Sequence, residues 1–211
     1  MKYSLVIWDW NGTLLDDVGP ALASVNDMLE RRKREPITLR QYYDYIGTPI
    51  RRFYERLFDL NAVDYAELLK EYNRGYEKHL ERGSLMKGAL EALDRFRAEG
   101  ASQIVVSSCE ETQLNRLIGR FGVAGYFDAV LGSSDFYAGS KVERAAGYIA
   151  AHAVEPAKTL VIGDLLHDAE TAKHIGADCV LLSAGHQSAE ILKESGLPVV
   201  GSIGQILDIV L

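Results

Sequence analysis

Short, continuously apolar runs recur along this chain and predict the strands of a parallel β-sheet. Strands covered by helices on both faces are apolar throughout, whereas half-exposed strands alternate apolar and polar positions. We expect such buried strands at residues 5–8, 103–107, 129–132, 159–163 and 178–182, and a weaker one at 199–200.

Amphipathic segments lie between these runs and predict helices at 88–98, 111–121, 142–153, 169–175 and 188–194. Repeated alternation of strand and helix is typical of an open parallel sheet with right-handed crossovers. The expected fold class is therefore α/β, with an open Rossmann-like parallel sheet and helices on both of its faces.

The interval from residue 15 to about residue 84 breaks this rhythm, because it contains helical patterns and no convincing strand. The helices are expected at 20–34, 39–46, 50–60 and 65–81, and Thr38 with Gln41 predicts a capping box for the second. A simple crossover is much shorter than this interval. We therefore expect an all-helical cap subdomain, residues 16–84, inserted after the first strand of an α/β core formed by 1–15 and 85–211. An insertion with two tethers beside the strand ends can act as a lid.

Composition places the chain among soluble globular proteins, with 211 residues of which 47% are hydrophobic and 25% charged. No run approaches the length of a membrane helix, and the first apolar run is too short for a secretory signal. Two cysteines, Cys109 and Cys179, form neither a disulfide framework nor a zinc site. We expect a cytoplasmic protein without a membrane partner.

The net charge of −7 at pH 7 argues against a nucleic-acid partner, which would favour a broad basic face. The basic run at 31–34 follows a helical pattern and is interpreted as a solvated helix end, stabilised by the helix dipole. The sequence does not distinguish a monomer from a homodimer.

Carboxylates follow two of the apolar runs directly. Asp9 comes after the run at 5–8, Asp164 ends the run at 160–163, and Asp168 lies four residues further on. Taken alone, Asp9 could be a nucleophile, a metal ligand or a turn residue. Two aspartates at adjacent strand ends would repel each other unless a cation lay between them, and hard oxygen ligands indicate Mg²⁺.

Three further residues are candidates for a role in binding or in capping a helix. The Ser107 hydroxyl, at the end of an apolar run, could donate to an oxyanion, and Ser108 with Glu111 predicts an ordinary capping box. Lys141 opens a helical pattern, where it is either an exposed lysine or a partner for a bound anion.

These clusters, in this order, resemble the four motifs of the haloacid dehalogenase superfamily. The first motif, Asp-x-Asp-x-Thr, is matched by Asp-Trp-Asn-Gly-Thr at 9–13, with Asn11 in place of the second aspartate. Ser107 matches the second motif, Lys141 the third, and Gly-Asp-Leu-Leu-His-Asp at 163–168 the fourth. The position of the helical insertion resembles the type 1 cap of the phosphoglycolate-phosphatase-like branch.

The resemblance implies a role for each matched residue. Asp9 would attack phosphorus and form an aspartyl-phosphate. The Asp9 carboxylate, the Asn11 carbonyl and the Asp164 carboxylate would hold Mg²⁺, supported by Asp168 directly or through water. Phosphoryl oxygens would be bound by Lys141 and Ser107, with assistance from the following residues: Ser108, Gly12 and Thr13.

Asn11 separates this chain from the phosphatases of the superfamily, in which the second aspartate protonates the leaving oxygen and then activates water. An asparagine keeps the shape and the backbone carbonyl but cannot exchange a proton. Three outcomes follow: an acidic leaving group that needs no help, a substitute such as Asp16 or His167, or slow turnover by a protein that mainly binds a phosphorylated ligand.

Two sister chemistries fit less well. A 2-haloacid dehalogenase uses no metal and would have no use for Asp164, and a phosphonatase needs a cap lysine where this chain has Arg51 and Arg52. These arginines could bind an anionic substrate or could form an exposed helix start. The sequence therefore predicts a Mg²⁺-dependent phosphatase for a small phosphorylated metabolite, with a weakly catalytic or non-catalytic phospho-ligand binder as the alternative.

Overall fold

The computed structural model describes residues 2–134 and 141–210, so Gly139 and Ser140, which precede Lys141, lie outside the described residues. Its backbone contacts divide the chain into two compact units. One unit combines Met1–Leu15 with Leu85–Leu211, and the other is the continuous segment Asp16–Ser84. Among the described residues, no helix has both the length and the apolar character that crossing a membrane requires.

A six-stranded sheet in the order β5-β4-β1-β6-β7-β8 forms the centre of the first unit, and its paired strands are parallel. The strands are β1 (Leu5–Trp8), β4 (Ser102–Glu110), β5 (Ala129–Ser133), β6 (Thr159–Gly163), β7 (Asp178–Leu182) and β8 (Val199–Val200). Trp8 is in register with both Val105 and Ile162. The carboxyl ends of β1, β4 and β6 therefore meet at one edge of the sheet.

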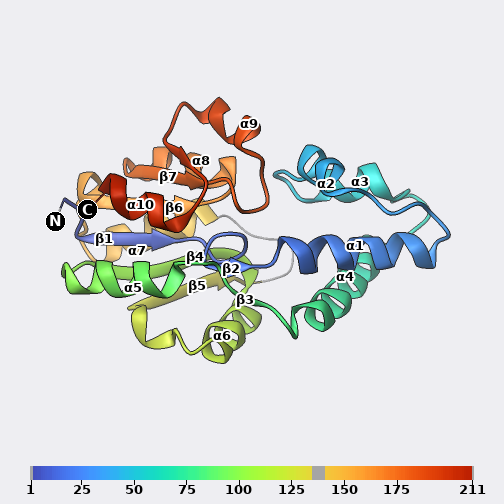
Figure 1. The fold of residues 1–211 in the computed structure, drawn as a ribbon, viewed down its shortest axis with the longest axis horizontal. Coiled ribbons are helices and arrows are strands. Elements are labelled where there is room, and N and C mark those ends of the chain that lie inside the picture. Colours follow the sequence, from blue (N-terminus) through green and yellow to red (C-terminus); the bar gives the residue numbers. More distant parts are fainter. Residues whose placement is uncertain (1, 135–140, 211) are drawn as a thin grey trace. The chain divides into compact units, whose positions relative to one another are not determined.

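Helices cover this sheet on both faces, as the continuously apolar strands predict (Figure 1). They are α5 (Ala89–Ala98), α6 (Glu111–Arg120), α7 (Lys141–Ala151), α8 (Leu166–Ile175), α9 (Ala189–Leu192) and α10 (Ile203–Val210). Leu5 and Ile7 belong to the core cluster that contains Ala145 of α7. Trp8, on the opposite face of β1, packs edge-to-face on Phe96 of α5, with ring centroids 5.7 Å apart.

The second unit contains α1 (Val18–Arg31), α2 (Leu39–Tyr45), α3 (Arg51–Leu57) and α4 (Tyr65–Leu80). The predicted capping box of α2 is present, since Thr38 and Gln41 bind each other's backbone N–H groups. Close packing of α1 and α4 needs a glycine: a Cβ on Gly75 would lie 2.6 Å from the Ser24 hydroxyl oxygen. That hydroxyl donates to the Tyr72 carbonyl at 2.7 Å.

The structure corrects the sequence prediction in three places. Two short strands, β2 (Leu15–Asp16) and β3 (Ser84–Leu85), pair with each other at the ends of the interval that was expected to lack strands. The helix expected at 188–194 is a single α-turn, α9, followed by a 3₁₀ turn. The chain also forms α10, which the sequence analysis does not predict. Short elements such as these depend on neighbours that local pattern does not reveal.

Candidate functional site

Three buried carboxylates converge at the edge of the sheet where β1 and β6 end. Asp9 follows β1, and its backbone N–H donates to Ile162 of the neighbouring strand β6 at 2.8 Å. Asp164 follows β6, and Asp168 lies in the first turn of α8. Each carboxylate offers an oxygen, and these three oxygens lie within 4.8 Å of one another.

Lys141 neutralises part of this negative charge. Its ammonium donates to Asp9 Oδ1 at 2.6 Å and to Asp168 Oδ1 at 2.5 Å, and the residue is only 2% exposed. The exposed-lysine interpretation of the sequence is therefore wrong. Since Lys141 is the first residue of α7, this helix begins directly at the acidic cluster.

Asp164 and Asp168 are fixed by hydrogen bonds from three segments of the chain. The Thr13 hydroxyl donates to Asp164 Oδ1 at 3.2 Å, and the His186 backbone N–H donates to Asp164 Oδ2 at 2.6 Å. Asp168 Oδ2 accepts from the backbone N–H groups of Asp164 and Leu165 at 3.0 and 2.9 Å. The Thr13 hydroxyl thus positions a carboxylate.

Glycines allow the backbone to approach these carboxylates closely. Gly12 has a φ of +73°, and a Cβ there would lie 2.2 Å from Asp164 Oδ2. A Cβ on Gly163 would lie 2.1 Å from Asp168 Cγ, and a Cβ on Gly185 would lie 2.3 Å from Asp164 Oδ2. No side chain fits in these positions without displacing the acidic residues.

Burial controls the protonation of the cluster. It raises the pKa of Asp9 to about 6, although the Lys141 charge acts in the opposite direction. Burial also raises the pKa of Asp164 well above its usual range. For Lys141, burial lowers the pKa, but the carboxylates of Asp168 and Asp9 outweigh it and hold the pKa above the ordinary lysine value. The cluster therefore holds three carboxyl groups and one ammonium, which binds two of them, an arrangement that a divalent cation would stabilise.

The predicted phosphoryl-binding serines differ in their surroundings. Ser107 is 1% exposed, and its hydroxyl oxygen accepts from the Cys109 backbone N–H at 3.2 Å. Ser108 lies within β4 and does not cap the following helix, so the predicted capping box is wrong. The cap of α6 is Glu110, whose carboxylate accepts from the backbone N–H groups of Thr112 and Gln113. The strand continues further than its apolar run, which moves the cap by two residues.

A family model described as haloacid dehalogenase-like hydrolase matches residues 6–182, which is most of the chain. The chain belongs to the haloacid dehalogenase-like hydrolase family. The match runs from β1 to the end of β7. It therefore includes Asp9, Lys141, Asp164 in the loop before α8, and Asp168 in α8.

Individual relatives carry the names of a phosphatase and of a kinase. The phosphoglycolate phosphatase of Pseudomonas fluorescens is 26% identical over 212 residues, covering 96% of this chain and 78% of that protein. The tyrosine-protein kinase PtkA of Mycobacterium tuberculosis is 28% identical over 200 residues, covering 93% of this chain and 67% of that protein. The crystal structure of a predicted phosphoglycolate phosphatase from Haemophilus somnus matches with a TM-score of 0.80 at 18% identity, covering 100% of this chain and 99% of that one. The resemblance to the phosphoglycolate-phosphatase-like branch is thus confirmed.

Arg51 and Arg52 lie in the helical unit of this hydrolase, at the start of α3, and both are exposed. Arg51 pairs with Glu55 at 3.0 Å, and its guanidinium lies over the ring of Tyr65, 5.2 Å from the centroid. Their exposure is compatible with both interpretations of the sequence, a helix start or an anion contact.

The sequence analysis missed the loop after β7, which contacts the acidic cluster. His186 and Gln187 are both buried; His186 binds Asp164 through its backbone, and the Gln187 side chain accepts from the Leu166 N–H at 2.7 Å. A search for ligand spacing among histidines could not find this loop, because its contact is made by the backbone. Its position in the sequence could have indicated it, because this loop follows β7 and β7 is the neighbour of β6, the strand that Asp164 follows.

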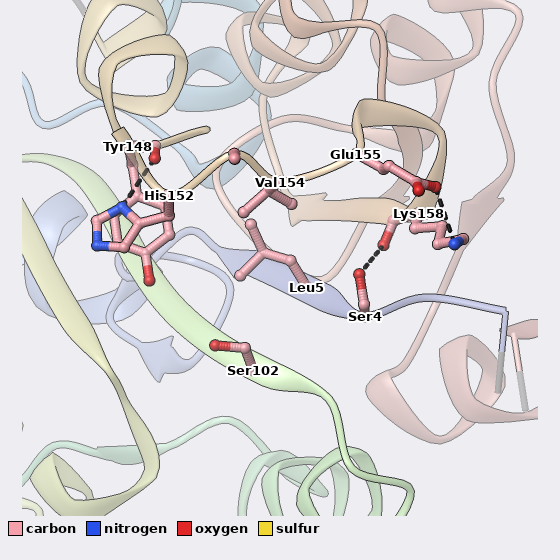
Figure 2. Close-up of a pocket in the computed structure, with 9 residues that line it drawn as sticks. Ser4, Leu5, Ser102, Tyr148, His152, Val154, Glu155 and Lys158 are labelled. Carbon is pink, nitrogen blue, oxygen red and sulfur yellow. Dashed lines mark hydrogen bonds and ion pairs between the residues drawn. The ribbon is translucent and has the colours of Figure 1, made fainter. Parts of the chain in front are cut away.

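A separate cavity of about 400 Å³ lies at the amino ends of β1 and β4, the edge of the sheet opposite the acidic cluster. Figure 2 shows its lining, which includes Ser4, Leu5, Ser102, Tyr148 and His152. Ligands of open parallel sheets bind at the carboxyl ends of the strands. We therefore do not regard this cavity as the candidate active site.

Proposed function

We propose that this hydrolase is a Mg²⁺-dependent phosphatase for a small phosphorylated metabolite, with Asp9 as its nucleophile. The observation that carries the proposal is the buried cluster in which Asp9 and Asp164, at the ends of adjacent strands, lie together with Asp168, while Lys141 binds Asp9. The relatives named phosphoglycolate phosphatase support the same reaction class.

The donor set of the cluster fits Mg²⁺, which prefers carboxylate and carbonyl oxygens. Asp9 and Asp164 would hold the ion together with the Asn11 carbonyl, and the ion would neutralise charge on the phosphoryl group. Asp168 already binds Lys141 with one oxygen and two backbone N–H groups with the other. We therefore assign Asp168 mainly to positioning, with support of the metal through water.

In the proposed reaction the Asp9 carboxylate attacks phosphorus, the bond to the leaving oxygen breaks, and an aspartyl-phosphate forms. Lys141 favours the ionised form of Asp9 despite its burial, because the ammonium lies 2.6 Å from Asp9 Oδ1. Ser107 has a hydroxyl proton to donate to a phosphoryl oxygen, since its hydroxyl oxygen accepts from Cys109. Water then attacks phosphorus, the bond between phosphorus and the Asp9 oxygen breaks, and inorganic phosphate leaves as the Asp9 carboxylate is regenerated.

Asn11 narrows the substrate class within this proposal. It cannot protonate a leaving oxygen, and the loss of such help typically slows a reaction by about 10²–10⁴-fold. The substrates favoured by this residue are acyl phosphates and phosphoanhydrides, whose leaving groups are stable without a proton. We further propose that Arg51 and Arg52 bind the anionic substrate.

Asn11 also favours a second candidate function, a weakly catalytic protein whose main activity is to bind a phosphorylated ligand. A dehalogenase or a phosphonatase has less support. A dehalogenase site would have no use for the buried Asp164, and an arginine in the cap cannot form the imine that a phosphonatase needs.

Two measurements test the proposed function. A panel of phosphorylated metabolites is assayed with and without Mg²⁺ on the parent and on Asp9→Asn. Asp178→Asn is the matched control, because Asp178 lies at the amino end of β7, away from the acidic cluster. Beryllium fluoride binding reports the nucleophile without turnover. We expect Mg²⁺-dependent release of phosphate and beryllium fluoride binding for the parent and the control, and neither for Asp9→Asn. Saturable binding of a phosphorylated ligand without either signal would favour the second candidate, and hydrolysis that survives Asp9→Asn would contradict the first.

A further inference from the structure

Arg144 connects α7 to the predicted phosphoryl-binding residue Ser107. It lies one helical turn after Lys141, and its Nη2 donates to the Ser107 carbonyl at 2.8 Å. A side chain that binds the backbone of a strand from a neighbouring helix fixes the position of that backbone. Arg144 itself lies outside the motifs on which the sequence analysis was based, although Ser107 belongs to the second of them.

The backbone around Ser107 has particular need of such a contact. The pairing of β4 with β5 is regular from Ile104 to Val106, then shifts its register, and resumes at Glu110 opposite Ser133. Ser107 begins the irregular segment, so the ladder with β5 does not set the direction of its side chain. A register shift of this kind re-aims side chains at the end of a strand.

Two contacts hold Ser107 from different sides. Arg144 binds its carbonyl, while the Cys109 backbone N–H donates to its hydroxyl oxygen at 3.2 Å. A hydroxyl that accepts one hydrogen bond keeps its own proton for a further acceptor. With both contacts in place, the Ser107 hydroxyl is a directed donor in a nearly inaccessible position.

The same helix also holds the nucleophile, because Lys141 binds both Asp9 and Asp168. One turn of α7 thus contacts Asp9 through Lys141 and the backbone of Ser107 through Arg144. We infer that Arg144 is a positioning residue that aims Ser107 at the phosphoryl group and so sets the affinity of the site for phosphate. This inference rests on the proposed phosphatase function.

The test compares five variants with the parent: Arg144→Ala, Arg144→Lys, Ser107→Ala, the double variant Arg144→Ala/Ser107→Ala, and Arg97→Ala. Arg97 is a matched control, because its guanidinium also donates to a backbone carbonyl, that of Gly125, but from α5 and without contact to Ser107. Hydrolysis of p-nitrophenyl phosphate with Mg²⁺ gives kcat and KM, and the inhibition constant of inorganic phosphate gives the affinity of the site.

We expect Arg144→Ala to raise KM and the inhibition constant of phosphate by about tenfold, the scale of one hydrogen bond from a charged group. Arg144→Lys keeps a single donor and should recover part of the loss, and Arg97→Ala should match the parent. The double variant should lose no more than Ser107→Ala alone, because Arg144 acts through Ser107.

Two results would overturn the inference while leaving the phosphatase proposal intact: parent-like constants for Arg144→Ala, or additive losses in the double variant. If Arg144→Ala does not fold, the Lys variant with and without Ser107→Ala supplies the same comparison. A parent that releases no phosphate from esters, acyl phosphates or phosphoanhydrides and binds no inorganic phosphate would refute the proposed function itself, and the inference about Arg144 would fail with it.

Discussion

Lys141 is the residue on which the charge balance of the buried site depends. It is almost inaccessible, and both of its ion-pair partners, Asp9 and Asp168, are buried as well. A buried ion pair contributes little compared with an apolar pair, but removing one member leaves the other charge without compensation. The structural role of this lysine is therefore separable from its proposed role in phosphate binding.

Replacement of Lys141 by methionine should lower the free energy of unfolding by about 3 kcal/mol, because two carboxylates lose their buried counter-charge. Denaturant unfolding without Mg²⁺ measures this loss. Lys173→Met, which removes an exposed lysine of α8, serves as the control and should change stability by less than about 0.5 kcal/mol. An equal effect of both substitutions would contradict the buried-charge argument.

In the proposed phosphatase, Asn11 is expected to limit which esters are hydrolysed. Asn11→Asp should raise the hydrolysis of alkyl phosphates by at least about tenfold, because a carboxylic acid can protonate a poor leaving group. Rates on acyl phosphates should change much less. Asn115→Asp on α6 is the matched control. A variant no faster than the parent on p-nitrophenyl and alkyl phosphates would show that the missing acid does not limit turnover.

At the scale of elements, the helical unit depends on contacts between α1 and α4. The end of α1 is joined to α4 by a small ion network: Arg31 binds Glu71 at 2.9 Å and Arg32 binds it at 2.7 Å. Arg32, followed by Arg31, lowers the pKa of Glu71, although partial burial acts in the opposite direction. The basic run at 31–34, expected to be a solvated helix end, thus contributes two of its charges to helix packing.

This network predicts a pH-dependent contribution to stability. Because the pKa of Glu71 is lower in the folded chain than in the unfolded chain, its stabilisation is complete above the unfolded pKa and is lost as the pH falls through the folded pKa. Glu71→Gln should cost up to about 1 kcal/mol at neutral pH and almost nothing in acid below the glutamate range.

Denaturant unfolding of the full chain over a pH series measures this difference. Glu67→Gln, on the same helix, removes a more exposed pair with Lys70 and is the control. A cost of Glu71→Gln that is independent of pH would contradict the ionic origin.

For the whole molecule, Mg²⁺ binding at the acidic cluster would be coupled to folding. The chain has a net charge of −7 at pH 7, and the carboxylates of the cluster come from segments that are far apart in the sequence. Only the folded chain brings them together. A cation that binds them therefore stabilises the folded state by mass action.

Addition of Mg²⁺ to the metal-free protein should raise the midpoint of thermal unfolding by roughly 5–10 °C at a hundredfold excess over its dissociation constant. Asp164→Asn should abolish this shift, whereas Asp178→Asn, which changes an aspartate outside the cluster, should retain it. Scanning fluorimetry or calorimetry measures both. A shift that persists in Asp164→Asn would place the ion elsewhere in the molecule.

The sequence by itself determined the parallel sheet and the residues that follow its strands. Continuous apolar runs specify strands that are buried on both faces, and β1, β6, β7 and β8 occupy the residues predicted for them. Since parallel strands end at a common edge, the same pattern placed Asp9 and Asp164 at that edge, and the adjacency of β1 and β6 in the sheet brings them together. The helices of residues 16–84 were likewise predicted from the helical pattern of apolar positions and from the capping box of Thr38 and Gln41.

Only the tertiary structure decided how the side chains of the site engage one another. The burial of Lys141 between two carboxylates, the backbone contact of His186, the Glu110 cap and the Arg144–Ser107 contact all join segments that are distant or differently paired. The sequence shows that a residue is polar, but whether its polar group is buried depends on the hydrogen-bond or ion-pair partner that it meets in the fold. The partner of each of these groups becomes known only when the strands and helices are packed together.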